Sequence, residues 1–208
     1  LARAREILDA DFRPPIKRGD LPKALLEGYR EIGIIDGEFL QGLSVSVQEI
    51  RQALASGVKL YGASSMGALR AVETHSLGMV GVGTVYEWYR DGKVSSDDEV
   101  AMTFHSEDFS PLSDPLVNIR GWLEGAKAAG LISAGTSEQI FKAAAAAPFP
   151  QRKIHQLLKG LEGNLPPEEL RSFGEFISRS GCDLKAMDAE RMLALMKMDY
   201  EIPRMAVG

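Results

Sequence analysis

Residues 58–75 read VKLYGASSMGALRAVETH, and this stretch decides the fold. The apolar run Val58–Ala63 predicts a buried strand, and from Ser64 the pattern changes at once to a helix over Ser65–His75. An earlier apolar run, Arg30–Asp36, predicts a second strand that ends in a turn. Between them, Val47–Leu54 carries apolar residues at helical spacing, with Ser44 or Ser46 as the expected N-cap and Gly57 as the expected end of the helix. Strand, helix and strand in this order form a βαβ unit of an open α/β sheet.

The sequence on either side of this unit predicts further helices. Short helices are expected over 2–9 and 21–28, a glycine-rich loop over 78–83, a helix over 84–91 and a strand over 99–105. The fold class is therefore α/β, an N-terminal open α/β sheet domain with a C-terminal helical subdomain. We place the α/β core with its elbow-like turn in residues 1–112 and the helical part in 113–208. The helices expected there are Leu116–Ala129, Thr136–Ala147, Lys153–Leu161, Pro166–Ser180 and Asp183–Tyr200.

Composition narrows the classes of function. The chain has 208 residues, of which 45% are hydrophobic and 25% charged, enough for one substantial core. Its net charge of −5 comes without a basic stripe, which argues against nucleic-acid binding. No apolar run of about 20 residues and no leader-like segment is apparent, so we expect a cytoplasmic protein without a membrane partner. One cysteine, Cys182, and three scattered histidines give no metal site, and neither metal nor cofactor is expected.

The turn at residues 62–67, GASSMG, is the strongest candidate for chemistry. Ser65 has Ala63 two residues before it and Gly67 two residues after it, the small-residue spacing of a nucleophile elbow. Backbone N–H groups at the start of the following helix, from Met66 and Gly67, would face a developing oxyanion. Ser64 is the second candidate for the nucleophile. The alternative is structural, because a serine before a helix commonly caps it.

Lys185 is the candidate base. It shares a helix face with Ala189, Met192 and Met196, so it projects from the apolar stripe of the last helix. If Asp183 caps this helix, the positive end of the helix dipole and the apolar surroundings both disfavour a charged lysine, as a lysine general base requires. The alternative is a lysine that snorkels past a partly buried helix or pairs with Asp188.

Other polar residues are weaker candidates for the functional site. Asp36 ends a strand at the carboxyl edge of the sheet, where open α/β folds gather ligands, although Asp36-Gly37 is equally a plain turn. Arg70 lies on the elbow helix and is also placed to pair with Glu73. The acidic run Asp97–Glu99 could bind a hard cation, although three adjacent carboxylates more commonly form a solvated turn.

Several motifs in order resemble the TfuA family. They are Arg13-Pro14-Pro15, Gly19-Asp20-Leu21, the segment IGIIDGEF at 32–39, GASSMGALRAVE at 62–73, Gly78-Met79, Tyr89-Arg90-Asp91-Gly92, Asp97-Asp98-Glu99-Val100-Ala101, Pro111-Leu112-Ser113 and Asp183-x-Lys185-x-x-Asp188-Ala189. The family's opening strand, ending in Gly-Pro-Ser or Gly-Pro-Thr, is not among these residues. Its His-Lys-Glu-Ile stands here as Val47-Gln48-Glu49-Ile50.

The resemblance implies an accessory role in thioamide formation. TfuA proteins act beside YcaO enzymes, which use ATP to activate a peptide amide so that sulfide can replace its oxygen. The family is associated with hydrolysis of a thiocarboxylated, ThiS-like sulfur-carrier protein by a serine–lysine pair, and with helping YcaO bind its peptide. Carried over by motif, the nucleophile is Ser65 and the base is Lys185. From their positions in the sequence, we expect the surrounding substrate and oxyanion groups to be Ser64, Met66, Gly67, Asp36, Gly37 and Arg70.

Two other readings stay open. The chain could be a non-catalytic adapter that tethers YcaO, sulfur carrier and peptide, with Ser65 only capping a helix. It could also be an unrelated serine hydrolase of small esters.

Overall fold

The computed structural model describes residues 2–39, 42–108, 110–180 and 182–205. These residues form two compact units, one of Leu1–Ser95 with Lys185–Gly208 and one of Ser96–Leu184. The C-terminal helix α10 (Leu184–Met205), with Lys185 in its first turn, therefore belongs with the sheet. These units divide the chain differently from the expected halves, 1–112 and 113–208.

A parallel sheet organises the first unit. Its strands β1 (Glu31–Ile34), β2 (Lys59–Ala63) and β3 (Val80–Val82) lie in the order β1-β2-β3. In register, Ile34 pairs with Gly62 and Ala63 pairs with Val82, so the carboxyl ends of the strands lie side by side. Of the three strands expected from sequence, those over Arg30–Asp36 and Val58–Ala63 are present as β1 and β2. The loop expected over 78–83 instead contains β3, so that prediction was wrong.

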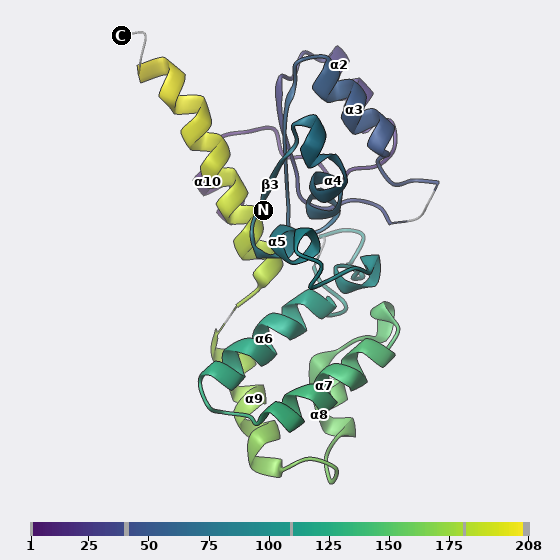
Figure 1. Ribbon diagram of the computed structural model, residues 1–208, viewed down its shortest axis with the longest axis vertical. Coiled ribbons are helices and arrows are strands. Elements are labelled where there is room, and N and C mark those ends of the chain that lie inside the picture. Colours follow the sequence, from purple (N-terminus) through teal and green to yellow (C-terminus); the bar gives the residue numbers. More distant parts are fainter. Residues whose placement is uncertain (1, 40–41, 109, 181, 206–208) are drawn as a thin grey trace. The chain divides into compact units, whose positions relative to one another are not determined.

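Helices cover both faces of this sheet. The crossover helices α3 (Val47–Ala55) and α4 (Met66–Thr74) pack with α2 (Asp20–Leu26) on the face that carries Ile34 and Leu60. On the other face, Tyr61 and Ala63 pack against methionines of α10. Figure 1 has α10 (yellow) and α4 on opposite sides of β3. Because successive residues of a strand point to opposite faces, the buried run Leu60–Ala63 of β2 requires cover on both sides.

Local sequence signals set the helix ends in this unit. Ser46 caps α3 in a capping box with Glu49, and Gly57, with φ 79°, follows its end. Both were expected. The remaining helices here are α1 (Ala2–Ile7), the 3₁₀ turn η1 (His75–Leu77) and α5 (Thr84–Arg90).

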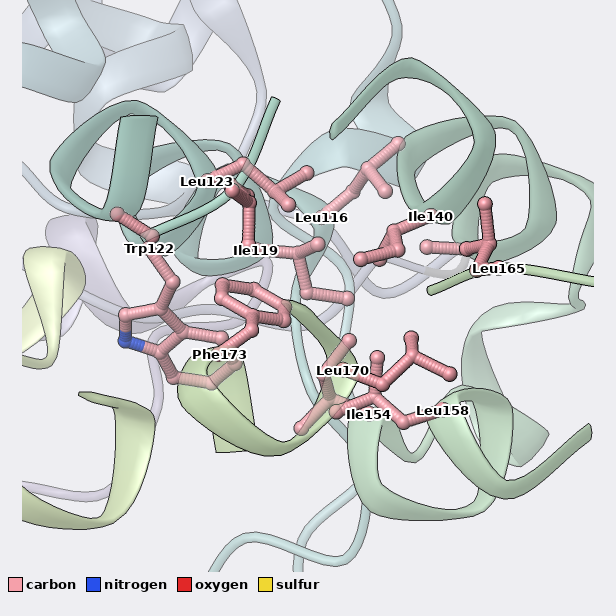
Figure 2. Close-up of a cluster of buried hydrophobic side chains, with 13 residues drawn as sticks. Leu116, Ile119, Trp122, Leu123, Ile140, Ile154, Leu158, Leu165, Leu170 and Phe173 are labelled. Atoms are coloured by element: carbon pink, nitrogen blue, oxygen red, sulfur yellow. The ribbon is translucent and has the colours of Figure 1, made fainter. Parts of the chain in front are cut away.

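The second unit is helical. It contains α6 (Leu116–Ala128), α7 (Ala134–Ala146), α8 (Ile154–Gly160) and α9 (Pro167–Ser180), with 3₁₀ turns η2 (Asp97–Glu99) and η3 (Phe149–Gln151). Apolar side chains from all four helices meet in one core, where the Phe173 ring lies next to Ile119 (Figure 2). Each of these helices begins and ends within two residues of its predicted bounds, whereas α10 continues five residues beyond Tyr200.

The strand predicted over 99–105 is wrong. Residues 97–99 form η2, and the segment that follows makes a single antiparallel bridge, Phe104 to Pro111. The backbone N–H of Thr103 donates to the hydroxyl of Ser113 at 2.9 Å instead of to a neighbouring strand. Side-chain hydrogen bonding of this kind competes with a β ladder.

The α/β fold class with a helical region is confirmed. Within the described ranges no helix combines the length and apolar character needed to cross a membrane.

Candidate active site

The chain makes a sharp turn between β2 and α4. The N–H of Ser65 donates to the carbonyl of Ala63 at 2.9 Å, which closes a three-residue γ-turn centred on Ser64. Ser64 has a φ of 72°, the conformation that makes this kind of γ-turn rare and strained. Ser65 occupies the N-cap position of α4 but makes no capping bond through its side chain. The simple capping role considered for Ser65 is therefore not observed.

Small residues let this turn fit against the sheet. A Cβ at Gly67 would overlap the Ile34 carbonyl, and one at Gly62 would overlap the Gly67 carbonyl. The N–H of Gly67 donates to the carbonyl of Ile35 at 3.1 Å, so this amide is already engaged. Of the two predicted oxyanion donors, Met66 keeps an amide without an intrahelical acceptor, because it is the first residue of α4.

The hydroxyl of Ser65 is buried without a partner. The residue has no exposed surface, and its Oγ makes no hydrogen bond to any described residue. An unpaired hydroxyl in the interior costs about 1–3 kcal/mol, so its presence calls for an explanation. Ser65 Oγ is accordingly not within hydrogen-bond distance of Lys185.

Lys185 reaches the same edge of the sheet from α10. Its side chain is nearly buried, at 5% exposure, and Nζ lies 3.2 Å from Oδ1 of Asp36. Asp36 follows β1 and its side chain is about half exposed. The residue before it, Ile35, accepts the Gly67 amide, so this ion pair lies next to the start of α4. Desolvation disfavours the lysine charge, whereas the carboxylate stabilises it.

Asp188, one turn further along α10, fixes the helix to the start of α5, just beyond the end of β3. It is fully buried, and its two oxygens accept from the backbone N–H groups of Thr84 (2.9 Å) and Val85 (2.7 Å). A Cβ on the intervening Gly83 would overlap this carboxylate. Burial raises the pKa of Asp188 above its ordinary value, against the lowering effect of these amides.

Together, the two contacts lay the start of α10 across the carboxyl edge of the sheet. Lys185 is attached beside β1 and Asp188 beside β3, and β2 is the strand between them. The turn at Ser64–Ser65 ends β2. The fold therefore gathers the predicted serine and lysine at one edge, although they stand 120 positions apart in sequence.

The remaining predicted site residues have structural partners. Arg70 donates to the carbonyl of Val45 at 2.7 Å and pairs with Glu73 at 2.6 Å, which ties α4 to the segment before α3. A Cβ at Gly37 would crowd Met66 and Ile16. Gly37 and Gly62 thus accommodate neighbouring atoms.

The acidic run of the second unit is engaged by arginines. Asp98 pairs with the buried Arg152, and Glu99 accepts two hydrogen bonds from Arg120 at 2.6 and 2.8 Å. Across the described ranges, no three His, Cys, Asp or Glu side chains gather as a metal site would require.

Sequence reasoning missed two roles. It placed Asp36 at the right edge but did not pair it with Lys185, and it considered Asp188 only as a lysine partner. Lys185 and Asp188 are three residues apart, which puts both on one face of the helix. This spacing was the sequence signal from which the role of Asp188 could have been predicted.

Comparison with family models identifies the family of this chain. A family model described as TfuA-like protein matches residues 36–153, which includes Asp36 and the serine turn and ends before Lys185. No curated protein gives a significant match. The family match covers more than half of the sequence and confirms the resemblance seen in its motifs: the chain belongs to the TfuA-like family.

Proposed function

We propose that this protein is a serine–lysine hydrolase that releases sulfide from a thiocarboxylated, ThiS-like carrier protein for YcaO-dependent thioamidation of a peptide backbone. Family membership supports an accessory role in thioamide formation. One observation carries the enzymatic part of the proposal. A strained turn holds a buried, unpartnered serine hydroxyl at the edge of the sheet that also receives a buried lysine.

The nucleophile comes from the pair Ser64–Ser65, and small-residue spacing assigns it to Ser65. Its Oγ attacks the thiocarboxylate carbon at the C-terminal glycine of the carrier, and a C–O bond forms as the C–S bond breaks. Lys185, when neutral, takes the hydroxyl proton and passes it to the departing sulfur, which leaves as hydrosulfide. Water then cleaves the acyl ester, giving the carrier carboxylate and restoring the serine. The Met66 amide is the candidate donor to the oxyanion.

Asp36 is the third group of the proposed site, beside the serine nucleophile and the Lys185 base. A base is commonly oriented by a partner of its own, and the 3.2 Å ion pair holds the Lys185 ammonium at the edge.

The partners follow from this reaction. The carrier presents a flexible tail to the edge, and sulfide passes to a YcaO-type enzyme that holds the peptide. A helper role in YcaO substrate binding accompanies hydrolysis, and all of this takes place in the cytoplasm.

The test is loss of the thiocarboxylate from a ThiS-like carrier, followed by intact mass. Wild type should convert the carrier to its carboxylate, whereas Lys185→Met should be slowed by about 100-fold or more, the usual contribution of a general base. Lys185→Arg is the matched control, because arginine keeps the positive charge beside Asp36 but does not deprotonate. If Lys185→Arg remains active, the lysine acts only as a charge. If wild type leaves the carrier intact but still supports thioamidation by YcaO, the adapter reading replaces the hydrolase.

A further inference from the structure

A buried asparagine of α6 contacts the residues that lead into α10. Asn118 is the single amide side chain among the otherwise apolar residues that α6, a helix described along its whole length, buries. Its Nδ2 donates to Oδ1 of Asp183 at 3.0 Å. Asp183 directly precedes Leu184, the first residue of α10, and therefore stands at the N-cap position of that helix. A buried amide needs hydrogen-bond partners, and here one partner is the residue at which α10 starts.

The same face of α6 contacts the two neighbours of Asp183. The indole N–H of Trp122 donates to the carbonyl of Cys182. On the other side, Leu184 lies against Gly121, where an added Cβ would be 3.7 Å from Cδ2 of the leucine. These two α6 residues follow the asparagine by four and three positions, which puts all three on one face of the helix. The three residues that lead into α10 are therefore all in contact with α6.

Lys185 follows these residues at once. It is the second residue of α10 and belongs to the sheet unit, whereas α6 and residues 182–184 belong to the helical unit. Helix ends fray, and the N–H groups of a first turn lack intrahelical acceptors, so the order of this turn depends on its cap. Loss of the cap would therefore loosen the turn that carries Lys185.

We infer that Asn118 is a positioning residue for Lys185. It holds Asp183 at the start of α10 and so keeps the lysine Nζ 3.2 Å from Oδ1 of Asp36, at the edge of the sheet that carries the serine turn. This inference rests on the proposed hydrolysis. Asn118 acts through the chain from Asp183 to Lys185, so the helical unit contributes to the rate without supplying a reacting group.

The test exchanges the two hydrogen-bonded partners. Asn118→Asp sets two carboxylates against each other and should lower kcat in the thiocarboxylated-carrier assay by about tenfold or more, with KM little changed, because the base is displaced. Asn118→Asp combined with Asp183→Asn restores an amide–carboxylate hydrogen bond with donor and acceptor exchanged. Asparagine caps a helix as well as aspartate does, so the combined variant should recover most of the lost kcat. Hydrogen exchange in the first turn of α10 should be faster in Asn118→Asp and return toward wild type in the combined variant.

Ser133→Ala is the matched control. Its hydroxyl caps α7 of the same unit by accepting from the Thr136 amide at 3.2 Å, so the variant loses a helix cap elsewhere in that unit. It should leave kcat and the exchange of the first turn of α10 unchanged. If Asn118→Asp does not fold, as judged by circular dichroism, Asp183→Ala makes the same test from an exposed position.

The inference is overturned by wild-type kcat in Asn118→Asp or in Asp183→Ala, by an equal loss in Ser133→Ala, or by a combined variant that recovers nothing. If wild type leaves the carrier intact, the proposed function fails and the effect on hydrolysis fails with it. The exchange comparison then still decides the structural part. Faster exchange in Asn118→Asp alone supports control of the start of α10 by Asn118, and equal exchange in all variants refutes it.

Discussion

The unpartnered hydroxyl of Ser65 has a measurable consequence for stability. Ser65→Ala deletes a buried hydroxyl that makes no hydrogen bond within the described structure, which relieves about 1–3 kcal/mol of desolvation cost. The void left by one oxygen atom opposes this by up to about 1 kcal/mol. The variant should therefore be more stable than wild type by about 1 kcal/mol.

Ser46→Ala is the matched control. Ser46 and Ser65 both precede nine-residue helices of the same unit, but the Ser46 hydroxyl accepts from the Glu49 amide at 3.2 Å and donates to its carboxylate at 2.8 Å. Loss of such a cap costs about 1 kcal/mol. In urea titrations followed by circular dichroism, the two variants should move the midpoint in opposite directions, each by about 0.5 M, given slopes of roughly 1–3 kcal/mol per molar urea. If Ser65→Ala is destabilised as much as Ser46→Ala, the Ser65 hydroxyl has a partner and this reasoning is refuted.

Three further predictions follow from other contacts. Gly67→Ala should destabilise the sheet unit by about 3 kcal/mol or more, because its Cβ would overlap the Ile34 carbonyl; a urea midpoint within error of wild type would contradict this. Hydrogen bonds from Lys59 and Tyr61 lower the pKa of Asp199. Asp199 therefore stabilises the fold above the ordinary carboxyl pKa of about 4, and this effect is lost as pH falls. The difference in free energy of unfolding between wild type and Asp199→Asn should shrink from pH 7 to pH 3. Arg152→Met should destabilise the helical unit by about 3 kcal/mol, because the carbonyls of Ala144 and Ala147 lose the hydrogen bonds that Arg152 donates to them. Hydrogen exchange should then accelerate in α6–α9 while β1–β3 stay protected.

The sequence was most informative where signals were local. The capping serine and terminal glycine of α3 fixed its bounds, and apolar spacing located the helices of the second unit. The strand β3 escaped detection because it is three residues long and has Gly81 at its centre. The ring of Tyr86 occupies the space where a Cβ of Gly81 would lie, so the glycine serves packing there and does not signal a loop.

The candidate site was only partly predictable, because some of its contacts join residues far apart in sequence. Spacing located the serine turn and the helix face of Lys185, since both are patterns within a few residues. The ion pair of Lys185 with Asp36 joins positions 149 residues apart, and the bonds of Asp188 to Thr84 and Val85 span more than 100. Such contacts depend on α10 returning to the sheet after the helical unit, which no local pattern specifies. The positive φ of Ser64 likewise could not be predicted, since serine alone does not favour it.

The central claim is that a serine of this turn becomes acylated by the carrier. Its most direct test is an acid quench of wild type mixed with thiocarboxylated ThiS-like carrier, followed by intact mass of the enzyme. The account predicts a transient species with the mass of enzyme plus carrier minus hydrogen sulfide, absent from a Ser64→Gly, Ser65→Ala double variant. Sulfide release that continues at the wild-type rate in the double variant, with no such species in either protein, would contradict it.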